Sequence, residues 1–200
     1  DKIYMPLDSS LTSIGGYFSR VMLNKQKGNF YVNAALGIIS PGFEYNDLGS
    51  QWMADKINGH LVTGYRWYEP DDVFRNKSVY LGYSRTSDFE DNISRSGFYL
   101  NSNVQFLNYW GINFNTSYNF KSVSTTLTRG GPKLNIPSNI SFNFSAYSDS
   151  REKITFSPYV SYWENAIGSN EKYFGFDVEW KPNSQISFSI GPEYALNYTS

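Results

Sequence analysis

Hydrophobic and polar residues alternate along most of this chain, most clearly between residues 173 and 190. The apolar positions there are Phe174, Phe176, Val178 and Trp180, followed after a turn by Ile186, Phe188 and Ile190. Small, polar or charged residues occupy the positions between them. A period of two is what a β-strand shows when its two faces meet different environments. The stretch therefore predicts two adjacent strands with one apolar and one polar face.

The same alternation recurs along the chain and predicts about ten strands. They are expected near residues 16–24, 29–39, 59–68, 77–85, 98–106, 112–120, 140–146, 154–162, 173–180 and 185–190. Compact turns between them alternate with longer connections at 40–58, 86–94, 122–138 and 164–171. Alternation of short and long connections is typical of up-and-down outer-membrane barrels, whereas a Greek-key sandwich has no reason to keep it. The predicted fold is an all-β, antiparallel, up-and-down transmembrane β-barrel.

The whole chain, residues 1–200, is read as one outer-membrane barrel segment. Residues 1–14 form an irregular lead-in, and the long extracellular loops are expected near 40–58 and 122–138. The tenth strand ends on the long-loop side with no sequence after it to continue the barrel. We therefore expect these strands to be part of a larger barrel.

Four of the five tryptophans lie at predicted strand ends. Trp67, Trp110 and Trp180 lie beside compact turns, and Trp163 lies beside a longer connection. Amphipathic aromatic rings gather at the two membrane interfaces, where barrels carry aromatic girdles. These four residues are predicted to be membrane-interface aromatics, although tryptophans capping a soluble core at strand ends would show the same placement.

Composition narrows the possible partners. The 17 basic and 18 acidic residues give a net charge of -1, so no basic surface for nucleic acid is indicated. The absence of cysteine excludes a disulfide framework and a thiolate metal site. No apolar run approaches the roughly 20 residues of a membrane helix. We expect outer-membrane lipid as a partner, no nucleic acid, no cofactor and no metal.

The polar face would line the interior of the barrel. The charged and ionisable residues predicted to face this lumen are Arg20, His60, Arg66, Lys121, Asp177 and Glu179. Such a nearly neutral lining, rich in Asn, Ser, Gly and Tyr, suits a water-filled or loop-plugged interior rather than a strongly ion-selective pore. Its tyrosines and asparagines are also able to bind sugars by stacking and hydrogen bonding.

Candidate catalytic chemistry is sparse. His60 is the only histidine, so a Ser-His-Asp arrangement would have to use it. No serine or carboxylate has a spacing that singles it out, and no catalytic residue is predicted. The acidic clusters at 71–72 and 88–91 lack the spacing of a calcium loop and are read as solvated turn carboxylates.

Two of the long connections contain sequence that turn formation alone does not require. Residues 40–49, continuing through 52–55, and the Arg-Gly-Gly-Pro sequence at 129–132 resemble a family of uncharacterised Gram-negative outer-membrane β-barrel domains. In that family the barrel usually follows an N-terminal module similar to family 9 carbohydrate-binding modules. The resemblance covers residues 15–200 and only the barrel part. It implies an outer-membrane location in a Gram-negative bacterium, and it carries no catalytic residues.

By the turn pattern, both of these loops lie on the extracellular side. The glycines Gly130 and Gly131 allow close backbone approach, so the loops are expected to pack on each other. In that interpretation Arg129 pairs with one of three carboxylates. The candidates are Glu44, Asp47 and Asp55. The packed loops would form a plug that braces the lumen or, alternatively, a ligand gate.

Two roles follow from the sequence: a pore, or a membrane anchor for a surface complex that includes other outer-membrane or surface proteins. Carbohydrate is the expected class of ligand or solute. The alternatives are a barrel-embedded hydrolase that uses His60 and a soluble periplasmic β-protein.

Overall fold

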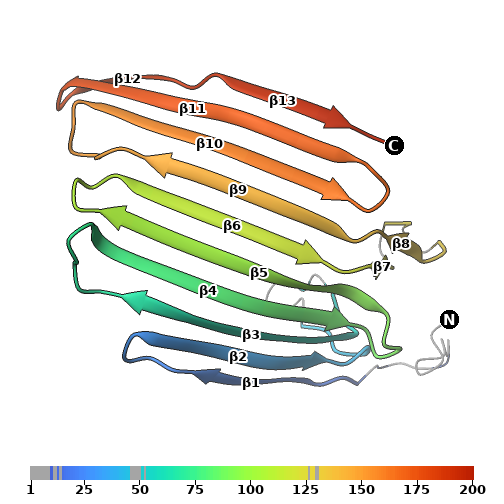
Figure 1. The fold of residues 1–200 in the computed structure, drawn as a ribbon. Helices are drawn as coiled ribbons and strands as arrows, with labels where there is room; N and C mark the ends of the chain where they lie inside the picture. The colour runs from blue at the N-terminus through green and yellow to red at the C-terminus, as the bar shows by residue number, and fades with distance from the viewer. Residues whose placement is uncertain are drawn as a thin grey trace.

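The computed structural model describes residues 10, 13, 15–45, 51, 53–125, 127–128 and 131–200. Within these residues the chain is built from strands and their connections, and no helix long and apolar enough to cross a membrane is found. Eleven strands form one sheet in the order β1-β2-β3-β4-β5-β6-β9-β10-β11-β12, with β13 also paired to β11 (Figure 1). All of these pairings are antiparallel. The described chain is therefore an antiparallel meander.

The strands follow the apolar alternation closely. Their bounds are β1 Phe18–Asn24, β2 Phe30–Ile39, β3 Lys56–Trp67, β4 Phe74–Ser87, β5 Ile93–Phe106, β6 Gly111–Asn119, β9 Asn139–Tyr147, β10 Ile154–Asn165, β11 Asn170–Asn183, β12 Ile186–Ile190 and β13 Glu193–Tyr198. A separate hairpin joins β7 Ser122–Ser124 to β8 Leu134–Ile136. Because β12 and β13 pair with successive parts of β11, they are two halves of one strand. Counted in this way, the sheet has ten strands, and the predicted all-β antiparallel fold is confirmed.

Two connections are much shorter than the sequence suggested. The connection predicted at 86–94 is a turn over 88–92, and the one predicted at 164–171 is a turn over 166–169. The strands extend further because backbone pairing continues through polar segments that show no apolar alternation, as at the start of β5. On this end of the sheet only the connections after β2 and after β6 remain long. The predicted alternation of short and long connections was therefore wrong at two of four places.

The two ends of the sheet differ in what they carry. The turns β1–β2, β3–β4, β5–β6, β9–β10 and β11–β12 gather at one end, called here the turn end (Figure 1). The other end, called the loop end, carries the hairpin β7–β8 and the connection between β2 and β3. The edge strands β1 and β12–β13 lie at opposite sides of the sheet, which is open over the described residues.

The described chain has no apolar core: none of its apolar side chains is buried. Leu61, Leu81, Phe98 and Phe174 point from one face of the sheet and are 52%, 49%, 47% and 53% exposed. Residues at the intervening positions, which form the polar face, are mostly half-buried in the central strands. A continuous exposed apolar surface marks a contact with membrane or with another protein. Whether the apolar face contacts lipid or another protein is therefore the main question about the function of this protein.

Tyrosine rings cover glycines on the polar face at four places. The register pairs are Gly64 with Tyr80, Gly82 with Tyr99, Gly111 with Tyr147, and Gly175 with Tyr159. A Cβ atom added to any of these glycines would overlap the facing tyrosine side chain. Glycine within a strand often marks such a close approach, because it leaves room for a group above the backbone. Because this contact between a tyrosine ring and a glycine occurs four times, it is a regular feature of side-chain packing on the polar face.

Candidate functional site

The middle of the polar face is a strip of amide and hydroxyl side chains on β5, β6 and β9. Asn101 donates a hydrogen bond to Asn115 at 2.9 Å, and Asn119 donates one to Asn139 at 3.0 Å. Further cross-strand contacts join Asn103 to Asn113 and Ser117 to Ser141. An amide has two donors and an acceptor with two lone pairs, so these bonds leave capacity for water or for a hydroxyl-bearing solute. We call these residues the amide strip.

Arg66 lies on the polar face near the turn end of β3. Its guanidinium carbon is 4.9 Å from the ring centroid of Tyr31 and 5.2 Å from that of Tyr80, and its Nε donates to the Tyr80 hydroxyl. Cation–π attraction and hydrogen bonding therefore hold the guanidinium. No described carboxylate forms an ion pair with it. The positive charge of Arg66 is thus positioned without being neutralised.

Carboxylates occupy the polar face on the other side of the sheet. Asp177 and Glu179 lie on β11, where Glu179 forms an ion pair with Lys181 at 2.8 Å. Glu193 on β13 accepts a 2.6 Å hydrogen bond from the Tyr159 hydroxyl. The polar face therefore has different chemistry on its two sides, with the amide strip between them.

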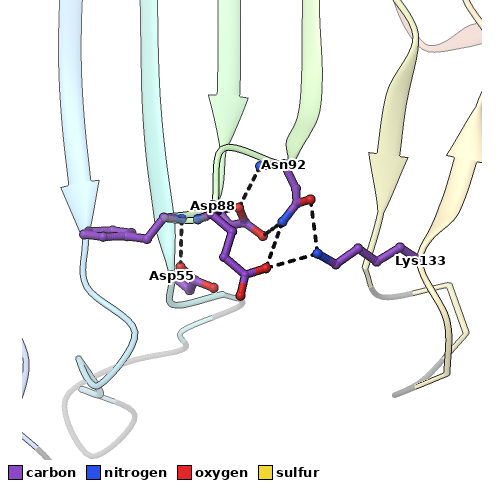
Figure 2. A network of polar contacts seen from close by, with 6 residues as sticks. Asp55, Asp88, Asn92 and Lys133 are labelled. Carbon is purple, nitrogen blue, oxygen red and sulfur yellow. Dashed lines mark hydrogen bonds and ion pairs between the residues drawn. The ribbon is translucent and has the colours of Figure 1, made fainter. Parts of the chain in front are cut away.

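At the loop end, side chains from three connections form the network shown in Figure 2. Asp88 Oδ1 accepts the backbone N–H groups of Glu90 at 3.0 Å and Asn92 at 2.8 Å. Lys133, beside β8, donates to Glu90 Oε2 at 3.0 Å and to Asn92 Oδ1 at 3.1 Å. Asp55, before β3, accepts the N–H of the residue after Asp88 at 3.1 Å. We call these five residues the loop cluster; it ties the connections before β3, between β4 and β5, and between β7 and β8.

A cavity of about 250 Å³ lies beside the loop cluster. Its lining includes Met53, Ser87, Asp88, Asn92 and Thr125, so it mixes polar groups with a methionine side chain. No group of three or more described His, Asp or Glu side chains is arranged to hold a metal ion. The cavity is therefore a small recess of mixed polar and apolar lining beside the loops.

The loop cluster leads to a prediction about its anchor residue. Replacing Asp88 by alanine is expected to lower the free energy of unfolding by about 1–2 kcal/mol, because two backbone N–H groups lose their acceptor. Lys133→Gln is the control: it removes the ion pair with Glu90 and the hydrogen bond to Asn92 but leaves both backbone N–H groups their acceptor, and about 0–1 kcal/mol is expected. Urea titration in lipid vesicles measures both variants, and an Asp88→Ala effect no larger than that of Lys133→Gln would contradict the anchoring role.

Tyr109 holds three turns together at the turn end. Arg75 Nη1 donates to the Tyr109 hydroxyl at 2.6 Å, and the Arg75 guanidinium lies 4.4 Å from the ring centroid. The Arg151 guanidinium lies 3.4 Å from the same centroid and forms a 2.5 Å ion pair with Asp149. Tyr109 has a φ of 66°, which is uncommon for a residue other than glycine. The hairpins β3–β4, β5–β6 and β9–β10 are thus connected through one ring.

Two carboxyl groups at the turn end are expected to make the stability of the protein fall in acid. Hydrogen bonds from Arg151, and then from a backbone N–H, lower the pKa of Asp149 to about 2; Lys77 and two backbone N–H groups do the same for Asp71. A carboxyl group whose pKa is lower in the folded state contributes stability above its ordinary pKa of about 3.9 and loses it as the pH falls through about 2.

Stability measured by urea titration should therefore decline between about pH 4 and pH 2, and the decline should be shallower in Asp71→Asn/Asp149→Asn. An identical slope in wild type and in this variant would contradict the assignment.

Most of the residues expected in the lumen lie on the polar face. Arg20, Arg66, Asp177 and Glu179 occupy polar-face positions of their strands by register. His60 does as well, and its Nε2 lies 2.6 Å from Asn33 Oδ1. Lys121 differs, because it is an exposed residue in the connection after β6.

The tryptophans divide between the two faces. Trp67 and Trp180 are exposed at apolar-face positions near the turn end, and Trp110 is exposed in the turn before β6; their interface role stays a prediction. Trp163 is half-buried in register with Ser141 and Glu171, so it lies on the polar face at the loop end. Its position differs from the sequence-based placement, because alternation along β10 puts it opposite its neighbours Tyr162 and Glu164.

The predicted packing of the loop at 40–55 against the loop at 129–132 involves some residues that the structure does not describe. Asp47, Arg129 and Gly130 lie outside the described residues, so the proposed ion pairs of Arg129 stay predictions. Glu44 is exposed in the connection after β2, and the N–H of Gly131 donates to the carbonyl of residue 128 at 3.1 Å. Asp55 contacts the β4–β5 turn through the backbone of Phe89.

Sequence reasoning missed that Asp88, Glu90, Asn92 and Lys133 connect the loops. A signal existed in the acidic segment at 88–91: aspartate often accepts the backbone N–H two residues further on in a turn. The contact of Lys133 had no such signal, because it depends on the path of a connection between two short strands.

Comparisons with known proteins agree with this architecture. A family described as "Domain of unknown function (DUF5916)" matches residues 4–200. A porin structure refined at 1.8 Å resolution is similar in fold, with a TM-score of 0.58 and 15% sequence identity; the match covers 98% of this chain and 61% of the porin chain. No curated protein matches the sequence. The chain thus spans about three-fifths of the length of the porin that it resembles.

Proposed function

The chain belongs to the family described as Domain of unknown function (DUF5916), and we propose that it forms part of an outer-membrane β-barrel through which small hydrophilic solutes pass in a Gram-negative bacterium. One observation carries this proposal. The sheet exposes a continuous apolar face, buries no described apolar side chain, and lines its opposite face with amides and hydroxyls. A membrane barrel places lipid on the first face and water on the second.

The pairing pattern supports a membrane setting. Inside a lipid bilayer each backbone N–H and C=O must be bonded within the protein, which antiparallel strands in a barrel achieve. The meander pairs each of its inner strands on both sides, and further strands would satisfy the free groups at β1 and at β12–β13. The porin-like fold supports the same reading.

The amide strip supports carbohydrate as a class of solute. Asn and Ser side chains bond hydroxyl groups in either direction, as donors or as acceptors. Tyr99, Tyr147 and Tyr159 lie on the same face and offer rings for stacking. A role in carbohydrate uptake would also suit a barrel that follows a carbohydrate-binding module.

A second candidate is a membrane anchor for a surface complex. The loop cluster favours it, because three connections tied to each other present a fixed surface at one end of the sheet. A hydrolase gains no comparable support. The amide of Asn33 contacts the imidazole of His60 and could orient it as the third member of a triad does, but no hydroxyl of a described residue is hydrogen-bonded to His60 as a nucleophile would be.

Conductance of the full-length protein in planar bilayers tests the pore. Asn143→Trp adds a large side chain to the polar face, and Phe144→Trp is a matched control on the apolar face one residue away. We expect wild type and Phe144→Trp to conduct equally and Asn143→Trp to conduct less. Absence of conductance, or equal conductance in all three proteins, would overturn the pore and leave the anchor.

A further inference from the structure

Charged residues on the polar face are segregated by sign. The strands β1 to β5 carry basic residues at polar-face positions, namely Arg20, Lys56, Arg66 and Arg95. Between β11 and β13 the same face carries acidic residues, namely Glu171, Asp177, Glu179 and Glu193. Among described residues, no acidic residue occupies a polar-face strand position on β1 to β5. Lys181, paired with Glu179 near the turn end, is the exception on the acidic side.

The strands between these two sets carry no charge on the polar face. On β6, β9 and β10 its residues are Gly, Asn, Ser, Thr, Tyr and Trp. Neighbouring strands lie about 4.8 Å apart, so crossing from β5 to β11 spans about 19 Å along the sheet. This exceeds the contact distance of an ion pair several-fold. The two sets of charges therefore do not neutralise each other through direct contact.

Several of these charges are also free of local ion pairs. Arg20 and Arg95 are exposed, and neither forms an ion pair with another described residue. The same holds for Glu171 and Asp177 on the opposite side. Arg66 is held by tyrosines rather than by a carboxylate. The positive charges on one side of the polar face and the negative charges on the other are therefore not neutralised by neighbouring side chains.

We propose that the passage carries a transverse electric field, directed from the basic wall on β1–β5 to the acidic wall on β11–β13, that favours zwitterionic solutes over uncharged solutes of the same size. This inference rests on the proposed pore. In a sheet curved around its polar face the two walls face each other across the water. Low-dielectric walls lined with charge strengthen such a field.

The field has two consequences for selectivity. A zwitterion aligns its opposite charges with the two walls, whereas a weakly polar solute only displaces oriented water. Ions of either sign find one attractive wall, because the four basic and four acidic wall residues are equal in number and Lys181 adds only one further positive charge. Cations and anions should therefore permeate wild type to a similar extent. Neutralising two charges of one wall should make the passage selective for ions of one sign.

Reversal potentials in a salt gradient test this with the full-length protein. Arg20→Gln/Arg95→Gln is expected to raise the ratio of cation to anion permeability several-fold, and Glu171→Gln/Asp177→Asn to lower it several-fold. The control is Arg85→Gln: Arg85 lies close to Arg95 on the paired strand but at an apolar-face position, where its partner is Asp91 in the β4–β5 turn, and the ratio should stay unchanged. Shifts that are absent, or equal to that of the control, would overturn the transverse field.

Vesicle swelling tests the solute class with an isomer pair, zwitterionic β-alanine and uncharged lactamide. After subtraction of swelling in protein-free vesicles, wild type should pass β-alanine faster. The combined variant Arg20→Gln/Arg95→Gln/Glu171→Gln/Asp177→Asn, which removes two charges from each wall, should lose most of that preference while still passing both solutes. Equal wild-type rates would overturn the proposed selectivity while the pore stands, whereas no swelling with either solute would overturn the pore and this inference together.

Discussion

Replacing Leu81 by arginine is expected to lower the free energy of unfolding from a bilayer by about 2–4 kcal/mol, the cost of a charge at the lipid face near the midplane. Leu81 lies in the middle of β4 and is 49% exposed on the apolar face. If that face met water, the same substitution at an exposed position would change stability by only about 0.5 kcal/mol. Urea titration of the protein folded into lipid vesicles measures the difference.

Two variants separate the charge from other effects. Leu81→Ala removes the side chain without adding a charge. Asn101→Arg adds the same charge on the polar face of β5 and loses one amide hydrogen bond, worth about 0.5–1.5 kcal/mol. A cost for Leu81→Arg that does not exceed that of both controls would place the apolar face in water and favour a soluble β-protein.

Replacing Gly82 by alanine is the second large effect, with an expected loss of about 1–3 kcal/mol from overpacking. The added Cβ would overlap the ring of Tyr99, which lies over Gly82 in the paired strand. Because alanine is ordinarily a better strand residue than glycine, backbone preference alone predicts the opposite sign. The free energy of unfolding in lipid vesicles again serves as the measurement.

The control glycine is Gly59, whose added Cβ would lie 3.3 Å from its nearest neighbour and needs only a small adjustment. Gly59→Ala is expected to be nearly neutral. In a double-mutant cycle, Tyr99→Ala should relieve most of the cost of Gly82→Ala, because the clash is with that ring. If Gly82→Ala costs the same with and without the tyrosine ring, the ring does not cause the loss.

The strands were predictable because the two faces of the sheet meet different environments. Around Phe142 and Phe144 each apolar residue is followed by a polar one, so both the strand and its faces can be read directly. The ends of the strands were harder to predict from the sequence. Residues 93–97 are mainly polar, and β5 begins there because its backbone bonds to β4, which side-chain alternation does not report.

The candidate site could be predicted less well than the strands, because its contacts depend on strand register and on the paths of the connections. Gly82 and Tyr99 are separated by a turn, and their packing becomes visible only once the pairing of β4 with β5 is known. Trp163 is a different case, because counting positions from Val160 along β10 already places it on the polar face. Proximity to a long connection is a weaker guide to the face of a strand residue than this count. The contacts of Lys133 required the actual path of the β7–β8 connection.

The order of the strands has a consequence for how the sheet is built. When β12 and β13 are counted as one strand, every pairing in it joins strands that follow each other in the chain, except β6 with β9, where the hairpin β7–β8 intervenes. The entropy lost in closing a connection grows with its length, so neighbouring hairpins can form with little delay. Closure of β6 on β9 must instead immobilise the longest excursion between paired strands in the described sheet. We expect this closure, together with closure of the β2–β3 connection over residues 40–55, to be the slowest pairing steps of the sheet.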